Sequence, residues 1–228
     1  MDKGKIGLIV AVEIDAVLKK YNNITKVNDD VYDIWCIDND NNYIYVVKSG
    51  VGEIYASAST QYLITKYGVQ LIVNFGIAGA LTSDMANNAV CIVDKVVHYD
   101  IDTSEVDNIE VGRYLDYPDV FIPATADLVA RATQVVGDLP VVTCASADKF
   151  VADPVRKQQL HTTYGADVCE MEAAGIVLTC NRNHIPCLII KSIADTLFGG
   201  AGEYWDRLSE ASDICVHIVD RIIAELQI

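Results

Sequence analysis

The stretch KIGLIVAV, Lys5–Val12, is a nearly continuous apolar run with the length of one β-strand. A strand with one solvent-facing side alternates apolar and polar residues, whereas a strand buried on both faces reads as an unbroken apolar run. Doubly buried strands are typical of parallel sheets that helices cover on both sides. This stretch therefore predicts an α/β fold whose first strand lies inside the sheet.

Apolar runs and helix-like segments alternate along the rest of the chain. Strands are expected at residues 69–76, 89–97, 139–146, 167–172 and 185–195, with a hairpin at residues 31–49. Helices are expected at residues 13–21, 52–68, 123–137, 153–165, 173–184 and 203–226. The alternation predicts a three-layer α/β/α fold with a central mixed, largely parallel sheet flanked by helices, in one domain over residues 1–228. GIAGAL is expected to form a turn after the strand at 69–76, and residues 98–122 a long loop.

Charge and composition exclude several classes of function. The net charge of −15 repels phosphate backbones, so we expect no nucleic-acid binding. No apolar run reaches the roughly 18 residues of a membrane helix, and no signal-peptide pattern begins the chain. The seven cysteines include no C-x-x-C pair and are expected to be reduced core thiols of a cytoplasmic protein. No histidine or cysteine spacing fits a metal site, so no metal or organic cofactor is expected.

Carboxylates recur at the predicted strand ends, where ligand crevices of α/β sheets lie. Asp15 follows the first strand, Glu170 and Glu172 end the strand at 167–172, and Asp195 ends the last one. Carboxylates in differing environments can protonate a leaving group, activate water and stabilise a cationic sugar, which is the chemistry of glycosidic bond cleavage.

Each carboxylate also has a purely structural interpretation. Asp15 could lie on the surface at a helix start, where the helix dipole favours it, and Asp195 could cap the segment after it. Glu170 and Glu172 would share one face of an extended strand, which could be a solvent-facing edge.

Five motifs together carry a family resemblance. In order they are KIGLIVAVEID, NFGIAGAL, SADKFV, VCEMEAAG and IIKSIAD, and they span essentially the whole chain. With these motifs the sequence resembles the nucleoside phosphorylase/nucleosidase superfamily, and within it the bacterial 5′-methylthioadenosine/S-adenosylhomocysteine nucleosidases. The resemblance implies a nucleoside phosphorylase-like fold, hydrolysis of the N-glycosidic bond of a purine nucleoside, and a homodimer in which the loop at 98–122 closes the partner's pocket.

The resemblance also implies roles for the catalytic carboxylates. Asp195 would protonate N7 of the purine, and Glu172 would bind the ribose hydroxyls and stabilise the ribosyl cation. Asp15 stands near the position of the family's water-activating glutamate, a role that could instead belong to Glu13. The resemblance assigns no role to Glu170, which is either a substrate-binding residue beside Glu172 or a support of the site that does not touch substrate.

The remaining implied contacts surround the substrate. Phe150 would stack on the purine, the Val151 backbone would read its edge, and Met171 would lie under the ribose. The turn with Ile77, Ala78 and Gly79 would approach the ribose and the attacking water, and Val51 would line the 5′ pocket.

Water is favoured over phosphate as the nucleophile. Superfamily phosphorylases place arginines around phosphate, including one before the glycine turn, where this chain has Val73-Asn74-Phe75. Two carboxylates at a dianion's position would cost several kcal/mol. A phosphate-dependent purine nucleoside phosphorylase, a nucleosidase for another nucleoside such as futalosine, and an impaired protein that only binds nucleosides stay open as alternatives, because Ile77 and Ala194 replace serines usual in the family and Lys191 replaces an arginine.

Overall fold

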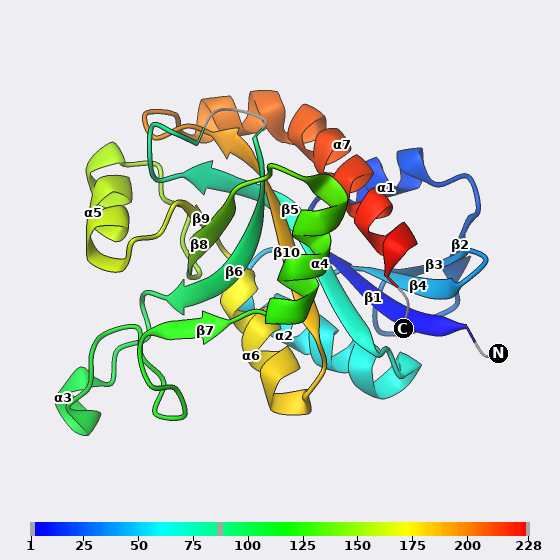
Figure 1. The fold of residues 1–228 in the computed structure, drawn as a ribbon, viewed down its shortest axis with the longest axis horizontal. Helices are drawn as coiled ribbons and strands as arrows, with labels where there is room; N and C mark the ends of the chain where they lie inside the picture. Colours follow the sequence, from blue (N-terminus) through cyan, green and yellow to red (C-terminus); the bar gives the residue numbers. More distant parts are fainter. Residues whose placement is uncertain (1–2, 86–88, 227–228) are drawn as a thin grey trace.

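The computed structural model describes residues 3–85 and 89–226 and centres on one mixed β-sheet (Figure 1). Its strands are β1 (Gly4–Val10), β2 (Ile24–Val27), β3 (Ile34–Asp38), β4 (Asn42–Lys48), β5 (Leu71–Ala80), β6 (Val90–His98), β7 (Phe121–Pro123), β8 (Val141–Ser146), β9 (Val168–Glu170) and β10 (Cys187–Asp195). The helices are α1 (Ile14–Lys20), α2 (Glu53–Tyr62), α3 (Ser104–Asp107), α4 (Ala126–Val136), α5 (Pro154–Tyr164), α6 (Ala173–Asn183) and α7 (Ala201–Glu225), and a π-helical turn (Leu63–Tyr67) continues α2.

Strand β5 is the centre of the sheet, and it is buried along its whole length. It pairs with β1 and β10 in parallel and with β9 in antiparallel orientation. The pairings β5–β10, β10–β6, β6–β8, β8–β9 and β9–β5 close a ring of five strands. From this ring the sheet continues through β1 and β4 to β3 and β2, and β7 adds to β6.

The predicted glycine turn after residue 76 is wrong. Strand β5 runs on through GIAGA to Ala80, and Gly76 and Gly79 are paired with residues of β10. A glycine inside a strand permits a close approach by another group. A Cβ on Gly76 would lie 2.9 Å from Glu13 Oε1, and one on Gly79 3.0 Å from both carboxyl oxygens of Asp195.

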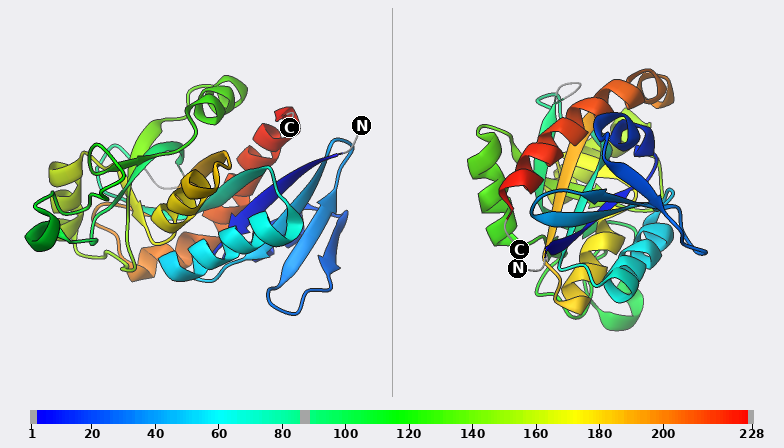
Figure 2. Two further views of the ribbon diagram at one scale, coloured as in Figure 1. Left: turned by 90° about the horizontal axis from the view of Figure 1, so that it is seen from below. Right: turned by 90° about the vertical axis from the view of Figure 1, so that its right-hand side faces the viewer.

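Helices cover both faces of the sheet, as expected for this fold class. Helices α1, α4 and α7 enclose one apolar core with β1, β5 and β10, and α2 and α6 enclose a second core on the opposite face. The right-hand view of Figure 2 shows α7 on one side of the strands and α2 with α6 on the other. The central mixed sheet flanked by helices is confirmed, although parallel and antiparallel strand pairings are equally represented.

Most of the predicted elements occur near their predicted positions. The hairpin is confirmed as β3 and β4, and the amphipathic C-terminal helix is confirmed as α7. Strand β2 was not predicted, and the loop at 98–122 contains α3 and most of β7. One domain over residues 1–228 stays a prediction, and residues 1–2, 86–88 and 227–228 lie outside the described part.

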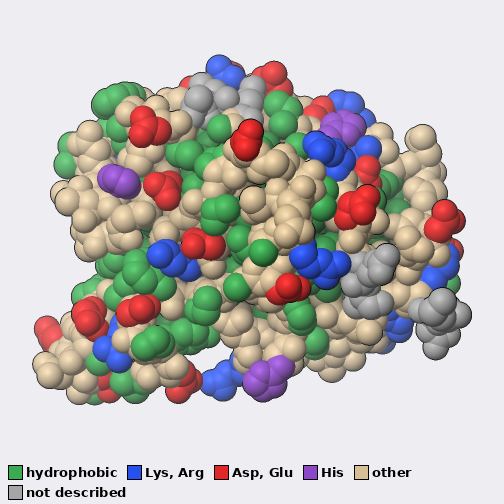
Figure 3. Space-filling view, in the orientation of Figure 1, with side chains coloured by type: hydrophobic (Ala, Val, Ile, Leu, Met, Phe, Trp, Pro, Cys, Tyr) green, Lys and Arg blue, Asp and Glu red, His purple; other side chains and the backbone are tan. Residues whose placement is uncertain are grey.

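Two surface properties bear on possible partners. Among the described residues, no helix combines the length and the apolar character needed to cross a bilayer. On the face in Figure 3, Lys and Arg side chains lie scattered among acidic and apolar ones rather than in one patch.

Candidate active site

A small cavity lies where β1, β9 and β10 end, against the second half of β5. It is lined by Ala11, Val12, Glu13, Val51, Ile77, Ala78, Gly79, Phe150, Cys169, Glu170, Met171, Glu172, Asp195 and Tyr204. The cavity therefore gathers every predicted site residue except Asp15 and Val151. It measures about 70 Å³, and two residues in its wall, Val51 and Phe150, are 46% and 41% exposed.

Glu13 occupies the position that was expected for Asp15. The chain turns sharply after β1, and the buried Glu13 carboxylate folds back over the strand end. Its Oε2 accepts hydrogen bonds from the backbone N–H groups of Ala11 (3.0 Å) and Val12 (2.9 Å), and Oε1 accepts one from Ile77 (3.1 Å).

The placement of Asp15 in the site is wrong. Asp15 is exposed in the first turn of α1, where a carboxylate is favoured by the helix dipole. The structural interpretation of this residue therefore fits better than the catalytic one. The alternative position for the water-activating carboxylate, Glu13, is the one inside the cavity.

Asp195 ends β10 and is held from two sides. A register irregularity between Ile193 and Asp195 sets its carboxyl group directly over Gly79 of β5. The fully buried ammonium of Lys157, from α5, forms an ion pair with Oδ2. Burial raises the pKa of Asp195, while the bond to Lys157 acts in the opposite direction, and the net shift is upward.

The prediction that Glu170 and Glu172 share one face of a strand is wrong. Strand β9 ends at Glu170, and Glu172 is the residue that precedes the first turn of α6. Glu172 Oε1 accepts a hydrogen bond from the backbone N–H of Gly52 (2.9 Å). Burial and the nearby Glu170 carboxylate raise the pKa of Glu172 to about 8, which favours the protonated carboxyl group at neutral pH.

Glu170 is an internal support of the site. Its Oε2 forms a buried ion pair with Lys191 Nζ (2.9 Å) and accepts the backbone N–H of Glu172 (3.0 Å). Both of its carboxyl oxygens also accept the N–H of Ala173. Burial alone would raise the pKa of Glu170, but the Lys191 charge and the Ser146 hydroxyl lower it below its ordinary value. Glu170 thus fixes the start of α6 and the backbone of Glu172.

A second buried carboxyl group, Glu53, completes this cluster from the start of α2. Ser146 Oγ lies 2.5 Å from Glu53 Oε1 and 2.5 Å from Glu170 Oε1. One hydroxyl hydrogen cannot serve two ionised carboxylates, so one carboxyl group must carry a proton. Lys191 keeps Glu170 ionised, and burial with the Glu170 charge raises the pKa of Glu53 to about 7, so Glu53 holds that proton.

The apolar side of the cavity contains the other predicted residues. Met171, Ile77 and Ala78 line its wall, and Phe150 packs edge-on against Tyr204 of α7 with ring centroids 5.5 Å apart. The Val151 side chain instead packs in a buried cluster with Leu160. The predicted role of the Val151 backbone stays a prediction.

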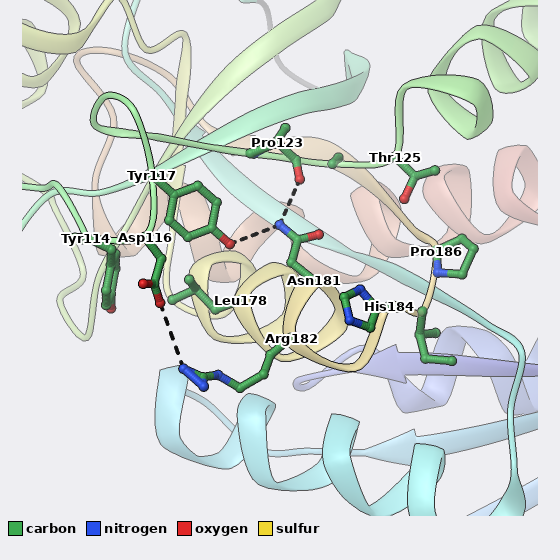
Figure 4. Close-up of a pocket in the computed structure, with 12 residues that line it drawn as sticks. Tyr114, Asp116, Tyr117, Pro123, Thr125, Leu178, Asn181, Arg182, His184 and Pro186 are labelled. Atoms are coloured by element: carbon green, nitrogen blue, oxygen red, sulfur yellow. Dashed lines mark hydrogen bonds and ion pairs between the residues drawn. The ribbon is translucent and has the colours of Figure 1, made fainter.

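A larger cavity of about 880 Å³ lies elsewhere, between α6 and the segment before β7. Figure 4 shows Asn181 bonded to Tyr117 and Pro123, and the exposed pair Asp116–Arg182. Among the described residues, no buried carboxylate lines this larger cavity. It offers more room for a ligand, but the smaller cavity holds the carboxyl groups that can catalyse a reaction.

Of the residues that the structure describes, no cationic side chain lines the smaller cavity. Its lining contains four carboxyl groups and no Lys, Arg or His. Within residues 3–85 and 89–226, no cluster of three or more His, Cys, Asp or Glu side chains is arranged to hold a metal ion.

The sequence analysis did not predict Tyr204 and Cys169 of the cavity wall, nor three residues that support the site from behind it. Lys157, Ser146 and Glu53 reach it from α5, β8 and α2, far away in the sequence. Lys157 stands in an otherwise polar helix and carries no local signal of burial. The acidic Glu53, directly after Gly52, reads in the sequence as a favourable residue in a first helical turn.

Comparisons with known proteins agree on one family. Residues 5–226 match the model of the phosphorylase superfamily. The 5′-methylthioadenosine/S-adenosylhomocysteine nucleosidase of Shewanella piezotolerans is 35% identical over 158 residues, which cover 67% of this chain and 68% of the relative. The native futalosine hydrolase of Helicobacter pylori superposes with a TM-score of 0.92 at 25% identity, covering 98% of each chain. The H. pylori 5′-methylthioadenosine/S-adenosylhomocysteine nucleosidase, in complex with an inhibitor, has the same fold (TM-score 0.93, 24% identity, 99% and 100% covered).

Proposed function

Because the chain belongs to the phosphorylase superfamily and to its 5′-methylthioadenosine/S-adenosylhomocysteine nucleosidases, we propose that it hydrolyses the N-glycosidic bond of a purine nucleoside. The expected substrates are 5′-methylthioadenosine and S-adenosylhomocysteine, with release of adenine and the thioribose. One observation carries the proposal most directly: Glu13, Glu172 and Asp195 line a single cavity from three different strand ends.

Asp195 is the acid of the proposed reaction. Its proton passes to N7 of the purine, and the electron pair of the glycosidic bond passes to the base, which leaves as a neutral molecule. The upward pKa shift of Asp195 suits a general acid that must hold its proton near neutral pH. Phe150 and Tyr204 stand at the side of the cavity where the base would stack, and their displacement would widen it for a nucleoside.

Glu172 and Met171 accommodate the ribose. Glu172 hydrogen-bonds the 2′ and 3′ hydroxyls and, once ionised, stabilises the positive charge on the ring. Because the raised pKa favours the protonated form, Glu172 must lose its proton when the cation forms on the ribose. Met171 supplies an apolar floor below the sugar.

Glu13 is the base that receives a proton from water. Three backbone N–H groups fix both of its oxygens, so the carboxylate is held in one orientation before substrate enters. Water held by Glu13 adds to C1′ of the ribosyl cation. This assignment moves the role from Asp15 to the buried neighbour two residues earlier.

Water is better supported than phosphate as the nucleophile. The N–H of Ile77, which could otherwise bind an anion, is already taken by Glu13 Oε1. A phosphate dianion there would meet the Glu13 carboxylate, and among the described residues no Lys, Arg or His lines the cavity to offset a repulsion of several kcal/mol. Futalosine is the second candidate substrate, because the fold likeness to a futalosine hydrolase reaches 25% identity over nearly the whole chain.

The decisive experiment gives the purified protein 5′-methylthioadenosine, S-adenosylhomocysteine and futalosine, each with and without phosphate. Free base and free ribose in phosphate-free buffer support hydrolysis. Strict dependence on phosphate, with a ribose 1-phosphate product, overturns it. Asp195→Asn should lower turnover at least 100-fold, because general acid catalysis contributes about 10²–10⁴; an unaffected variant would refute the acid assignment.

We also propose a homodimer in the cytoplasm that acts as a single domain. Three exposed apolar side chains support a partner on this surface: Val51, which lines the cavity, and Ile54 and Tyr55, which follow it in the first turn of α2. Equilibrium sedimentation would test the dimer: a mass near twice 24.9 kDa is expected, and a monomer over the micromolar range contradicts it.

A further inference from the structure

Lys157 is the fully buried cation closest to the proposed chemistry. It lies in α5, a helix that places most of its other charged and polar side chains in solvent. Its Nζ donates to Asp195 Oδ2, to the carbonyl oxygen of Thr196 (2.6 Å) and to that of Gly199 (3.5 Å). Three acceptors match the three hydrogens of an ammonium group, and this geometry fits an ion pair of Lys157 with Asp195.

The ion pair leaves the two oxygens of Asp195 in different environments. Oδ2 is taken by Lys157, and both oxygens lie against the bare backbone of Gly79. Among the described residues no donor contacts Oδ1, and Asp195 lines the cavity. The transferable proton of the carboxyl group therefore belongs on Oδ1.

We propose that Lys157 is a positioning residue for the acid step: it fixes Asp195 through Oδ2 and stabilises the carboxylate that remains after Oδ1 has given its proton to the purine. This inference rests on the proposed function. In the step the Oδ1–H bond breaks, an N7–H bond forms, and the electron pair of the C1′–N9 bond goes to the base. The negative charge left on Asp195 faces an ammonium that is already in contact, so no solvent must reorganise.

Other ionisable groups near Asp195 cannot replace this cation. Glu203 and Tyr204 face it from α7, and Cys169 faces it from β9. Each of these becomes anionic when it ionises, and the facing segment of β5, Gly76–Ala80, carries no charged side chain. Among the described residues, Lys157 is the one cation that forms an ion pair with Asp195.

The test compares Lys157→Met and Lys157→Gln with Lys66→Met, which removes the same charge from an exposed site. The pH profile of kcat is measured with 5′-methylthioadenosine. Without Lys157 the pKa of Asp195 rises, so the alkaline limb should move upward by about one pH unit or more, and kcat at pH 7 should fall more than about tenfold with KM within about threefold. Lys66→Met should match the wild type.

A loss of kcat that is equal at every pH, with no movement of the alkaline limb, overturns the inference and indicates a structural role only. Folding is checked by thermal melting, and Lys157→Met is expected to fold because a buried aspartate without a partner becomes neutral. A wild-type protein that releases no base from any purine nucleoside overturns the proposed function itself, before any variant is compared.

A second measurement needs no change at Lys157. In ¹H–¹⁵N spectra of lysine-labelled protein, the buried ammonium groups of Lys157 and Lys191 should give slowly exchanging NH₃⁺ signals. Asp195→Asn should shift one of the two and leave the other in place. Two unmoved signals, or none, would contradict the charged contact.

Discussion

Lys191→Met is the most demanding test of the buried charge cluster. Lys191 is 1% exposed, and its Nζ lies 2.9 Å from Glu170 Oε2. Within the described part of the chain, Lys191 is the one cation that forms an ion pair with Glu170, so the substitution leaves that carboxyl group buried beside Glu53 and Glu172. Breaking a buried ion pair by removing one partner costs about 3–5 kcal/mol. For a chain of this size each kcal/mol moves Tm by about 2–4 °C, so Tm at pH 7 should fall by roughly 6–20 °C.

The pH dependence of this loss has a definite sign. The folded-state pKa of Glu170 lies below its ordinary value of 4.5, so the stabilisation is present above that value and is lost as pH falls through the lower folded-state pKa. Thermal melts of the wild type and the variant should therefore converge in acid, as pH falls below 4.5, and differ most near pH 7.

Two control variants separate charge from packing. Lys26→Met breaks the ion pair of Lys26 with Asp33, in which the two side chains are 62% and 60% exposed. The free energy of unfolding should fall by no more than about 1 kcal/mol. Lys191→Met combined with Glu170→Gln removes both charges and should lose less than Lys191→Met alone. If the single variant at Lys191 loses no more than Lys26→Met, or if the double variant loses more than the single, the reasoning is refuted.

Glu172→Gln should remove the pH dependence that the raised pKa of Glu172 gives to the fold. Folded protein keeps the Glu172 proton up to about pH 8, whereas the unfolded chain loses it near pH 4.5, so wild-type stability should fall as pH rises from 4.5 to 8. At pH 8 the variant should be more stable than the wild type by about 1–3 kcal/mol in urea titrations, although its turnover is lost. Glu13→Gln should lower kcat by about 10²-fold or more, whereas Asp15→Asn should leave it within about twofold; equal effects would return Asp15 to the mechanism. Gly76→Ala places a Cβ 2.9 Å from Glu13 Oε1 and so displaces this carboxylate. We expect kcat to fall at least tenfold, which corresponds to about 1.4 kcal/mol in activation free energy, while the circular dichroism spectrum stays unchanged.

The core strands could be predicted because each of them is a local run of apolar residues. β1 and β5 are apolar runs, and both lie inside the sheet. The continuation of β5 through Gly76 and Gly79 was not predictable from propensity, which assigns glycine to turns. It depends on β10 lying alongside and on the space that Glu13 and Asp195 require. β2 was missed because its residues are mostly exposed and lack an apolar alternation.

The site was predictable to the extent that its residues follow strand ends. Asp195 and Glu172 do so, and both reach the cavity. Glu13 and Asp15 could not be separated by sequence alone, because the turn after β1 decides which carboxylate faces inward. The role of Lys157 could not be predicted from its neighbours in the sequence. Its partner, Asp195, lies 38 residues away, and the packing of α5 brings the two side chains together.

The closed ring of strands has a consequence for how the molecule opens. Each of β5, β6, β8, β9 and β10 is hydrogen-bonded to neighbours on both sides, so none can leave without breaking two ladders. β2, at the far end of the sheet, is bonded on one side alone. Amide hydrogen exchange should therefore proceed first in β2 and last in the ring. Asp195 and the glycines of β5 belong to the segment that survives every partial unfolding, so the acid stays in place in molecules that have already lost their outer strands.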